Sequence, residues 1–123
     1  MKPILYLLIA SFFLSGFSFQ LMSQSLTYEG SSGVGKGKHI VFIASDHEYR
    51  GEETCPAIAR ILAKRHGFKC TVLFGLDNDG YIKPGSSKIP GMEALGKADM
   101  MFLFLRFLAP DDVTMKPFTD YLD

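Results

Sequence analysis

Hydrophobic residues occur along this chain as short continuous runs, separated by stretches in which they recur every three or four positions. Continuous runs of strand length occupy residues 39–44, 68–74 and 100–107. Segments with helical spacing or a helix-start signal follow them, at residues 54–66, at residues 92–97 and after Pro110. Strand and helix therefore alternate. Three such units joined by right-handed crossovers predict an α/β fold with a parallel sheet and helices on both faces.

Two of the expected helices have an identifiable buried stripe. In the first helix, Ile58, Ile61 and Leu62 lie on one face, and Gly67 is a suitable left-handed residue to end it. In the third helix, the acidic residues of the first turn suit the positive end of the helix dipole. The candidate buried contacts of this third helix are Val113, Phe118, Tyr121 and Leu122.

The third strand carries the most hydrophobic run after the amino-terminal segment, MMFLFLRFL at residues 100–108. A run that is apolar on both faces is typical of a strand covered by helices on each side of a parallel sheet. Arg106 is the exception, and we expect it at the carboxyl edge of the sheet, where its charge stays solvated or paired. In a flavodoxin-like order the first and third strands are neighbours, so a crevice between their carboxyl ends would place Arg106 beside residues 46–53.

Candidate chemistry is concentrated directly after the first strand. Seven of eight consecutive positions have ionisable or hydrogen-bonding side chains: Asp46, His47, Glu48, Tyr49, Arg50, Glu52 and Glu53. A polar turn needs fewer side chains of this kind. We expect His47 to act as general acid or base, oriented by Asp46 or Glu48. The expected substrate contacts are Tyr49, Arg50, Glu53 and Arg106.

Other interpretations of these residues remain open. Arg106 would serve equally well in a structural ion pair with one of the carboxylates, and such a pair is compatible with ligand binding. In a module without chemistry, His47 would be a structural residue that anchors the loop. His47 and Glu48 are also compatible with two ligands of a divalent metal, provided that further ligands come from elsewhere. The cofactor is therefore left unknown.

Residues 1–23 have the layout of a secretory signal peptide, because Lys2 is followed by a mostly apolar run at residues 4–19 and then by small residues. The uninterrupted apolar part is shorter than the roughly 20 residues that span a bilayer. We expect cleavage after Ser18 or Ser23, a secreted or periplasmic product, and no stable membrane anchor after cleavage.

Residues 24–37, QSLTYEGSSGVGKG, are rich in Gly and Ser and predict a flexible leader ahead of a domain at residues 38–123. The glycines fit a phosphate loop until its last position, where Gly37 replaces the Ser or Thr that binds magnesium, and the segment precedes a strand instead of following one. No nucleotide is expected. The chain has 13 basic and 13 acidic residues and no basic run, so no nucleic-acid partner is expected either.

Two cysteines are present, Cys55 at the start of the first helix and Cys70 at the start of the second strand. Export would permit a disulfide. We favour two buried free thiols, because a helix start and the next strand start tend to lie at opposite ends of a βα unit.

The segments KHIVFIASDHEYRGEET, FGLDNDGYIKPGSSKIPGMEALGKADMMFLFLRF and LAPDDVTMKPFTDYLD resemble the first half of a ThuA-like (trehalose utilisation) domain. The resemblance covers residues 38–123 and implies the class I glutamine amidotransferase-like fold, a relative of the flavodoxin-like fold. It also implies a link to carbohydrate metabolism, without implying glutaminase activity. In that fold the nucleophile elbow follows a fourth strand, so the expectation is a domain truncated after three strands.

Two functional classes follow for this chain. In the first, it is an exported enzyme that acts on a sugar or sugar derivative in carbohydrate catabolism. In the second, it is a non-catalytic carbohydrate-binding or interaction module. Both take a small carbohydrate as the partner, and the oligomeric state is left open.

Overall fold

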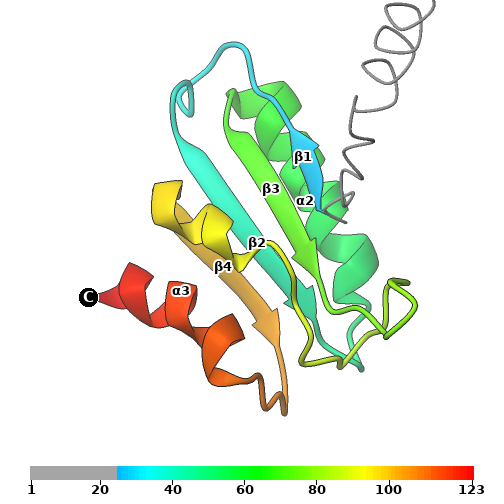
Figure 1. Cartoon of the computed structure of the whole chain (residues 1–123). Coiled ribbons are helices and arrows are strands. Elements are labelled where there is room, and N and C mark those ends of the chain that lie inside the picture. The colour runs from blue at the N-terminus through cyan, green and yellow to red at the C-terminus, as the bar shows by residue number, and fades with distance from the viewer. Residues whose placement is uncertain (1–24) are drawn as a thin grey trace, which may run out of the picture.

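Strand β2 (His39–Ser45) lies inside a four-stranded open sheet whose order is β1-β3-β2-β4 (Figure 1). It pairs in parallel with β3 (Lys69–Phe74) on one side and with β4 (Met100–Leu105) on the other. The computed structural model describes residues 25–123, so the expected signal peptide lies outside the described residues. The α/β class is confirmed. The first and third parallel strands, β2 and β4, are neighbours in the sheet, as expected.

The sheet is mixed, because a strand that the sequence pattern did not predict lies at its edge. Strand β1 (Leu26–Tyr28) pairs antiparallel with β3, with Leu26 opposite Val72. The expectations of a flexible leader and of a purely parallel, three-stranded sheet were therefore wrong for this part of the chain. The Gly/Ser segment after β1 is held against the end of the first helix, where the Gly35 N–H donates to the His66 carbonyl at 2.8 Å. A Cβ on Gly30 would lie 2.2 Å from the Gly67 backbone, so this glycine permits close contact.

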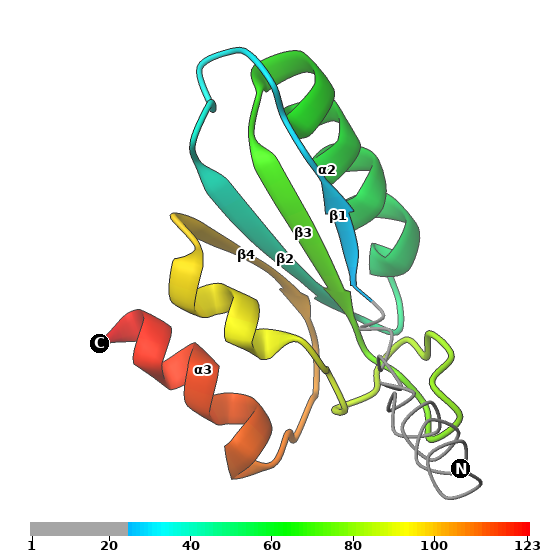
Figure 2. The ribbon, with the colours of Figure 1, turned by 45° about the horizontal axis from the view of Figure 1, so that its top comes forward.

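Helices cover both faces of the sheet, as Figure 2 shows. Helix α2 (Gly51–His66) packs on one face, over the β2 side chains Ile40, Phe42 and Ala44. The short 3₁₀ helix η1 (Met92–Lys97) and helix α3 (Asp112–Leu122) lie on the opposite face, over Val41 and Ile43. Alternate residues of β2 thus fill two separate cores, as a strand covered on both sides requires.

Helix α2 begins three residues earlier than its hydrophobic stripe predicted and ends at Gly67 as predicted. Its buried face consists of small residues, Cys55, Ala59 and Ala63, which bring the helix close to the sheet. The expected stripe was partly wrong, because Ile61 is 55% exposed. Because the small residues of α2 face the sheet, the bulky side chains of this helix lie at the rim of the contact.

Strand β4 is only partly buried, although its sequence predicted a strand covered on both faces. Leu103 is 44% exposed, and among residues 25–123 no strand pairs with the outer edge of β4. Helix α3 has no fully buried residue. Of its expected contacts, Phe118 and Tyr121 pack against the core, whereas Val113 and Leu122 are exposed.

Cys55 and Cys70 are both buried and unpaired, which confirms the expected free thiols. Desolvation raises the pKa of each thiol to about 11, and the nearby Glu52 carboxylate adds to the effect at Cys55. Over residues 25–123, no helix is long and apolar enough to cross a membrane.

Candidate functional site

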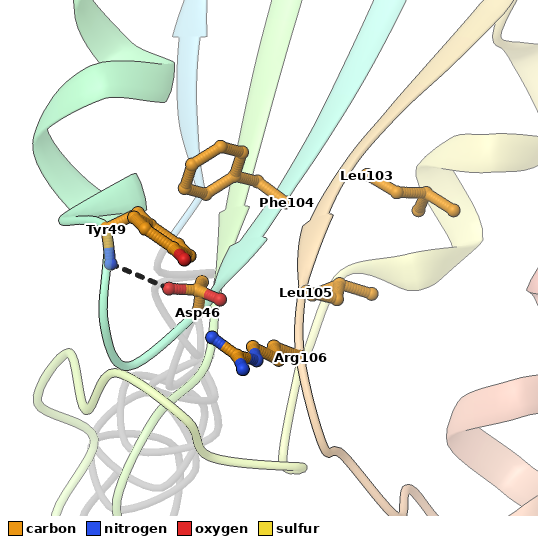
Figure 3. Close-up of a pocket in the computed structure, with 6 residues that line it drawn as sticks. All are labelled: Asp46, Tyr49, Leu103, Phe104, Leu105 and Arg106. Atoms are coloured by element: carbon orange, nitrogen blue, oxygen red, sulfur yellow. Dashed lines mark hydrogen bonds between the residues drawn. The ribbon is translucent and has the colours of Figure 1, made fainter.

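The candidate site lies where β2 and β4 end side by side. Ser45 is opposite Leu105 in the parallel ladder, so the residues that follow each strand emerge at the same edge of the sheet. A shallow pocket of about 370 Å³ opens there (Figure 3). Its lining residues are Asp46, Tyr49, Leu103, Phe104, Leu105 and Arg106. This volume is within the range of small-molecule sites, so it suits a ligand of small size.

Asp46 is buried, lines the pocket and shapes the loop that follows β2. Its Oδ1 accepts hydrogen bonds from the backbone N–H groups of Glu48 and Tyr49, each at 2.7 Å. Burial opposes ionisation, but these two hydrogen bonds, with the positive charges of His47 and Arg106, outweigh it and lower the pKa of Asp46. Asp46 is therefore an ionised carboxylate whose clearest role is to hold the loop in place.

Arg106 reaches across the pocket edge and forms an ion pair with Glu48, in which Nη1 donates to Oε2. Figure 3 shows its guanidinium on the side of Asp46 opposite the ring of Tyr49. The alternative in which Arg106 pairs with a carboxylate of the β2 loop is thus observed. About a third or more of each side chain remains exposed, so the pair is accessible to a ligand.

His47 is exposed beside this ion pair. Its ring lies 6.1 Å from the ring of Phe107, centroid to centroid, and the rings are tilted by 43°. No described residue donates a hydrogen bond to its imidazole or accepts one from it. The carboxylates expected to orient it are engaged elsewhere, Asp46 with backbone N–H groups and Glu48 with Arg106.

Arg50 and Glu53 are paired with each other and lie away from the pocket. The Arg50 guanidinium donates to Glu53 one turn into helix α2, and both side chains are largely exposed. The backbone of Arg50 has a φ of 53°, in the left-handed region, and its carbonyl accepts from the Glu53 and Thr54 N–H groups. Tyr49, by contrast, is 62% exposed and lines the pocket. Of the expected substrate contacts, Tyr49 and Arg106 are brought together, and Arg50 and Glu53 are not.

Phe107 is a site residue that the sequence pattern did not single out, because it continues a hydrophobic run. Its ring is 81% exposed, and the Cζ atom of Arg106 lies 4.6 Å from the ring centroid. Its φ of 53° is the second left-handed value among the non-glycine residues described. Such a backbone is strained by about 1–3 kcal/mol and often marks a functional site. The one signal in the sequence was the Arg-Phe pair that follows the third strand.

The loop between β3 and η1 is hydrogen-bonded both to the end of β2 and to the segment that follows β4. Ser45 Oγ donates to the Ser86 carbonyl at 2.6 Å, and the Gly85 N–H donates to the Ser45 carbonyl at 3.0 Å. On the other side, the Ala109 N–H donates to Ser87 Oγ at 2.9 Å. The loop thus connects the segments that carry His47 and Phe107. Hydrogen bonds of the main chain and of serine side chains therefore position the two segments of the site.

Metal ligation is not evident in this part of the molecule. In the described range, no group of three or more His, Cys, Asp or Glu side chains is placed to hold a metal ion. The turn that starts at Asp77, whose carboxylate accepts from the Asp79 and Tyr81 N–H groups, is a local hydrogen-bonded turn.

Comparisons of the chain with protein-family models, with characterised proteins and with solved structures gave no match.

Proposed function

We propose that this chain is a ThuA-like domain that binds and acts on a sugar or sugar derivative, with its site at the carboxyl ends of β2 and β4. The observation that carries the proposal is the convergence of three groups: Arg106 lines an open pocket, pairs with Glu48, and shares the ring of Phe107 as a neighbour with His47. These groups come from two segments far apart in sequence and are not needed to fill the core. Arranged in this way, they can exchange hydrogen bonds with the hydroxyl groups of a small ligand.

In this proposal His47 performs the proton transfer. A neutral imidazole takes a proton from a sugar hydroxyl or from water, and the imidazolium later returns it to a leaving oxygen. Arg106 and Glu48 hold neighbouring hydroxyl groups, the former as donor and the latter as acceptor. The Tyr49 ring, which lines the same pocket, excludes water from one side of the ligand.

A second function, a carbohydrate-binding module without catalysis, is favoured by one observation. His47 has no hydrogen-bonded carboxylate among the described residues, because Asp46 and Glu48 make other contacts. A general base is usually held by such a partner. An imidazole without one can still donate or accept a hydrogen bond to a bound sugar.

One experiment separates these two functions. The purified protein is incubated with trehalose, glucose and methyl α-glucoside, and the sugars are followed by proton NMR. New sugar signals that vanish in His47→Gln but persist in His66→Gln support catalysis, because His66 is exposed at the far end of α2. Saturation transfer to an unchanged sugar supports the binding module. If neither occurs with any of these sugars, the carbohydrate proposal is wrong.

The resemblance also underlies two further parts of the proposal. The fold is proposed to be flavodoxin-like and class I glutamine amidotransferase-like, which the order β3-β2-β4 of its parallel strands supports. The protein is proposed to be secreted or periplasmic, on the sequence of residues 1–23. Amino-terminal sequencing of the mature protein tests this part, and a new terminus between residues 19 and 25 is the expected result.

A further inference from the structure

Phe107 has no evident structural reason to be a phenylalanine. It follows Arg106 beyond β4 and keeps 81% of its surface exposed. A ring that stays in water contributes little hydrophobic stabilisation to the fold. Its φ of 53° is also one that residues with a Cβ rarely adopt, and Gly, Asn or Asp would suit this backbone better. Neither packing nor backbone preference accounts for this side chain, which points to a contact outside the protein.

The ring is nevertheless held in a defined place by the polar groups of the site. The guanidinium carbon of Arg106 lies 4.6 Å from the ring centroid, a distance typical of a cation–π contact. The imidazole of His47 lies 6.1 Å away, centroid to centroid. Phe107 therefore presents an open aromatic surface directly beside the groups that are proposed to bind hydroxyls.

The charges around the pocket restrict the ligand further. Asp46 and Glu48 are negative, and the one positive guanidinium at the pocket, that of Arg106, is already paired with Glu48. The formal charges of Asp46, Glu48 and Arg106 sum to minus one. An anionic ligand would be repelled by these carboxylates. An uncharged ligand would meet both donors and acceptors.

We propose that Phe107 is the stacking platform for an uncharged pyranose ring. The face of a pyranose that is rich in C–H bonds lies on the open phenyl surface, while the hydroxyl groups at its rim reach Arg106 and Glu48. This inference rests on the proposed carbohydrate function and specifies its substrate class as neutral sugars, not uronates or sugar phosphates.

The test measures sugar binding by saturation-transfer NMR and by titration. The probes are methyl α-glucoside and trehalose as neutral sugars and glucuronate as the charged analogue. Phe107→Ala should weaken binding of the neutral sugar by roughly tenfold, and Phe107→Trp should retain it, because a flat aromatic surface is kept. The matched control is Tyr81→Ala, since Tyr81 is a similarly exposed aromatic residue, 72% exposed, in the loop between β3 and η1. It should bind as the wild type does.

A second variant separates a ligand contact from a structural role. Phe107→Gly removes the ring and relieves the left-handed backbone, so it should bind poorly while melting at the same temperature as the wild type or higher. A lower melting temperature would show that the ring supports the fold and would overturn the inference.

The remaining outcomes are equally decisive. If the wild type and Phe107→Ala bind a neutral sugar equally well, the stacking role of Phe107 is wrong. The carbohydrate function then still stands. If glucuronate binds more tightly than the neutral sugars, the restriction to uncharged ligands is wrong. If Phe107→Ala instead changes the oligomeric state in sedimentation, Phe107 is an interface residue. If the wild type binds none of the probes, the proposed function and this inference fail together.

Discussion

The guanidinium of Arg106 donates a hydrogen bond to the carboxylate of Glu48, although the two residues are 58 positions apart in the sequence. The parallel pairing of β2 with β4 creates this contact, because it aligns the two strand ends. Glu48 is thereby positioned by Arg106, and Arg106 is positioned over Phe107. The loop after β2 and the segment after β4 thus form one site.

Replacing Arg106 should affect the ligand more than the fold. Arg106→Met removes an ion pair between partly exposed side chains, so the free energy of unfolding should fall by no more than about 1 kcal/mol. Sugar binding should be lost. Arg106→Lys should also bind poorly, because an ammonium group cannot replace the planar guanidinium. Urea denaturation and sugar titration measure the two effects.

Lys116→Met provides the matched control for this prediction, because Lys116 forms an exposed ion pair with Asp120 on helix α3. It should have the same small effect on stability and none on binding. A loss of more than about 3 kcal/mol for Arg106→Met would be typical of a buried ion pair and would contradict the assignment of Arg106 to the ligand.

Asp46 should stabilise the loop after β2 in a pH-dependent way. Asp46→Ala removes the acceptor of two backbone hydrogen bonds and should lower the melting temperature. Because the folded pKa of Asp46 lies below its usual value of 3.8, its ionised form contributes stability above that pH, which is lost as the pH falls through the folded pKa. Asp46→Asn keeps an acceptor oxygen without the charge, so its stability should decline less steeply in acid. Equal acid profiles for the wild type and Asp46→Asn would refute this role.

His39 should make the protein less stable in mild acid. Burial and the nearby positive charge of Lys69 lower its pKa below 6.5. The opposing effects of a hydrogen bond with the Lys97 backbone and of the charges of Glu29 and Asp99 are smaller. The unfolded chain then binds more protons between the two pKa values, so stability is complete above about pH 6.5 and falls as the pH drops toward the folded pKa. His39→Gln should flatten this dependence in thermal melts between pH 7 and 5, values chosen to span this window.

The control for the His39 prediction is His66→Gln, at the exposed end of α2. It should leave the wild-type profile unchanged. If the two variants have the same profile, the mild-acid dependence does not come from His39.

Gly51 should be intolerant of a side chain. A Cβ at this first residue of α2 would lie 2.4 Å from the ring of Phe104 on β4, so the ring, the helix start or the strand must move. Gly51→Ala should therefore lower the free energy of unfolding by about 1–3 kcal/mol, as overpacking does. Gly96→Ala is the matched control, because a Cβ there meets nothing within 4 Å. If both alanine variants are equally stable, α2 does not approach β4 as closely as described.

The buried thiols should react only when the protein opens. Cys55 and Cys70 have a pKa of about 11, so the reactive thiolate is scarce at neutral pH, and neither sulfur is accessible. A thiol reagent at pH 8 should modify them slowly in buffer and rapidly in urea. Fast modification of either cysteine in the native protein would contradict the burial of that residue.

The sequence by itself determined the elements that depend on local pattern. Continuous apolar runs and helical spacing located β2, β3, β4 and the three helical segments, because side-chain periodicity follows directly from strand and helix geometry. The end of α2 at Gly67 could also be predicted from local sequence, since a left-handed terminal residue favours glycine. The clustering of ionisable groups after β2 marked the site for the same reason.

Tertiary structure decided which of these residues meet. Strand β1 has only three residues and forms because the edge of β3 offers unpaired backbone groups, which no local pattern reveals. The choice of Glu48 over Asp46 as the partner of Arg106 depends on the register of β2 with β4 and on the backbone N–H groups that already bind Asp46. Phe107 continues an apolar run in the sequence, and only its left-handed backbone turns it out of the core and over the site. Each of these outcomes requires contacts between segments that the chain brings together only by folding.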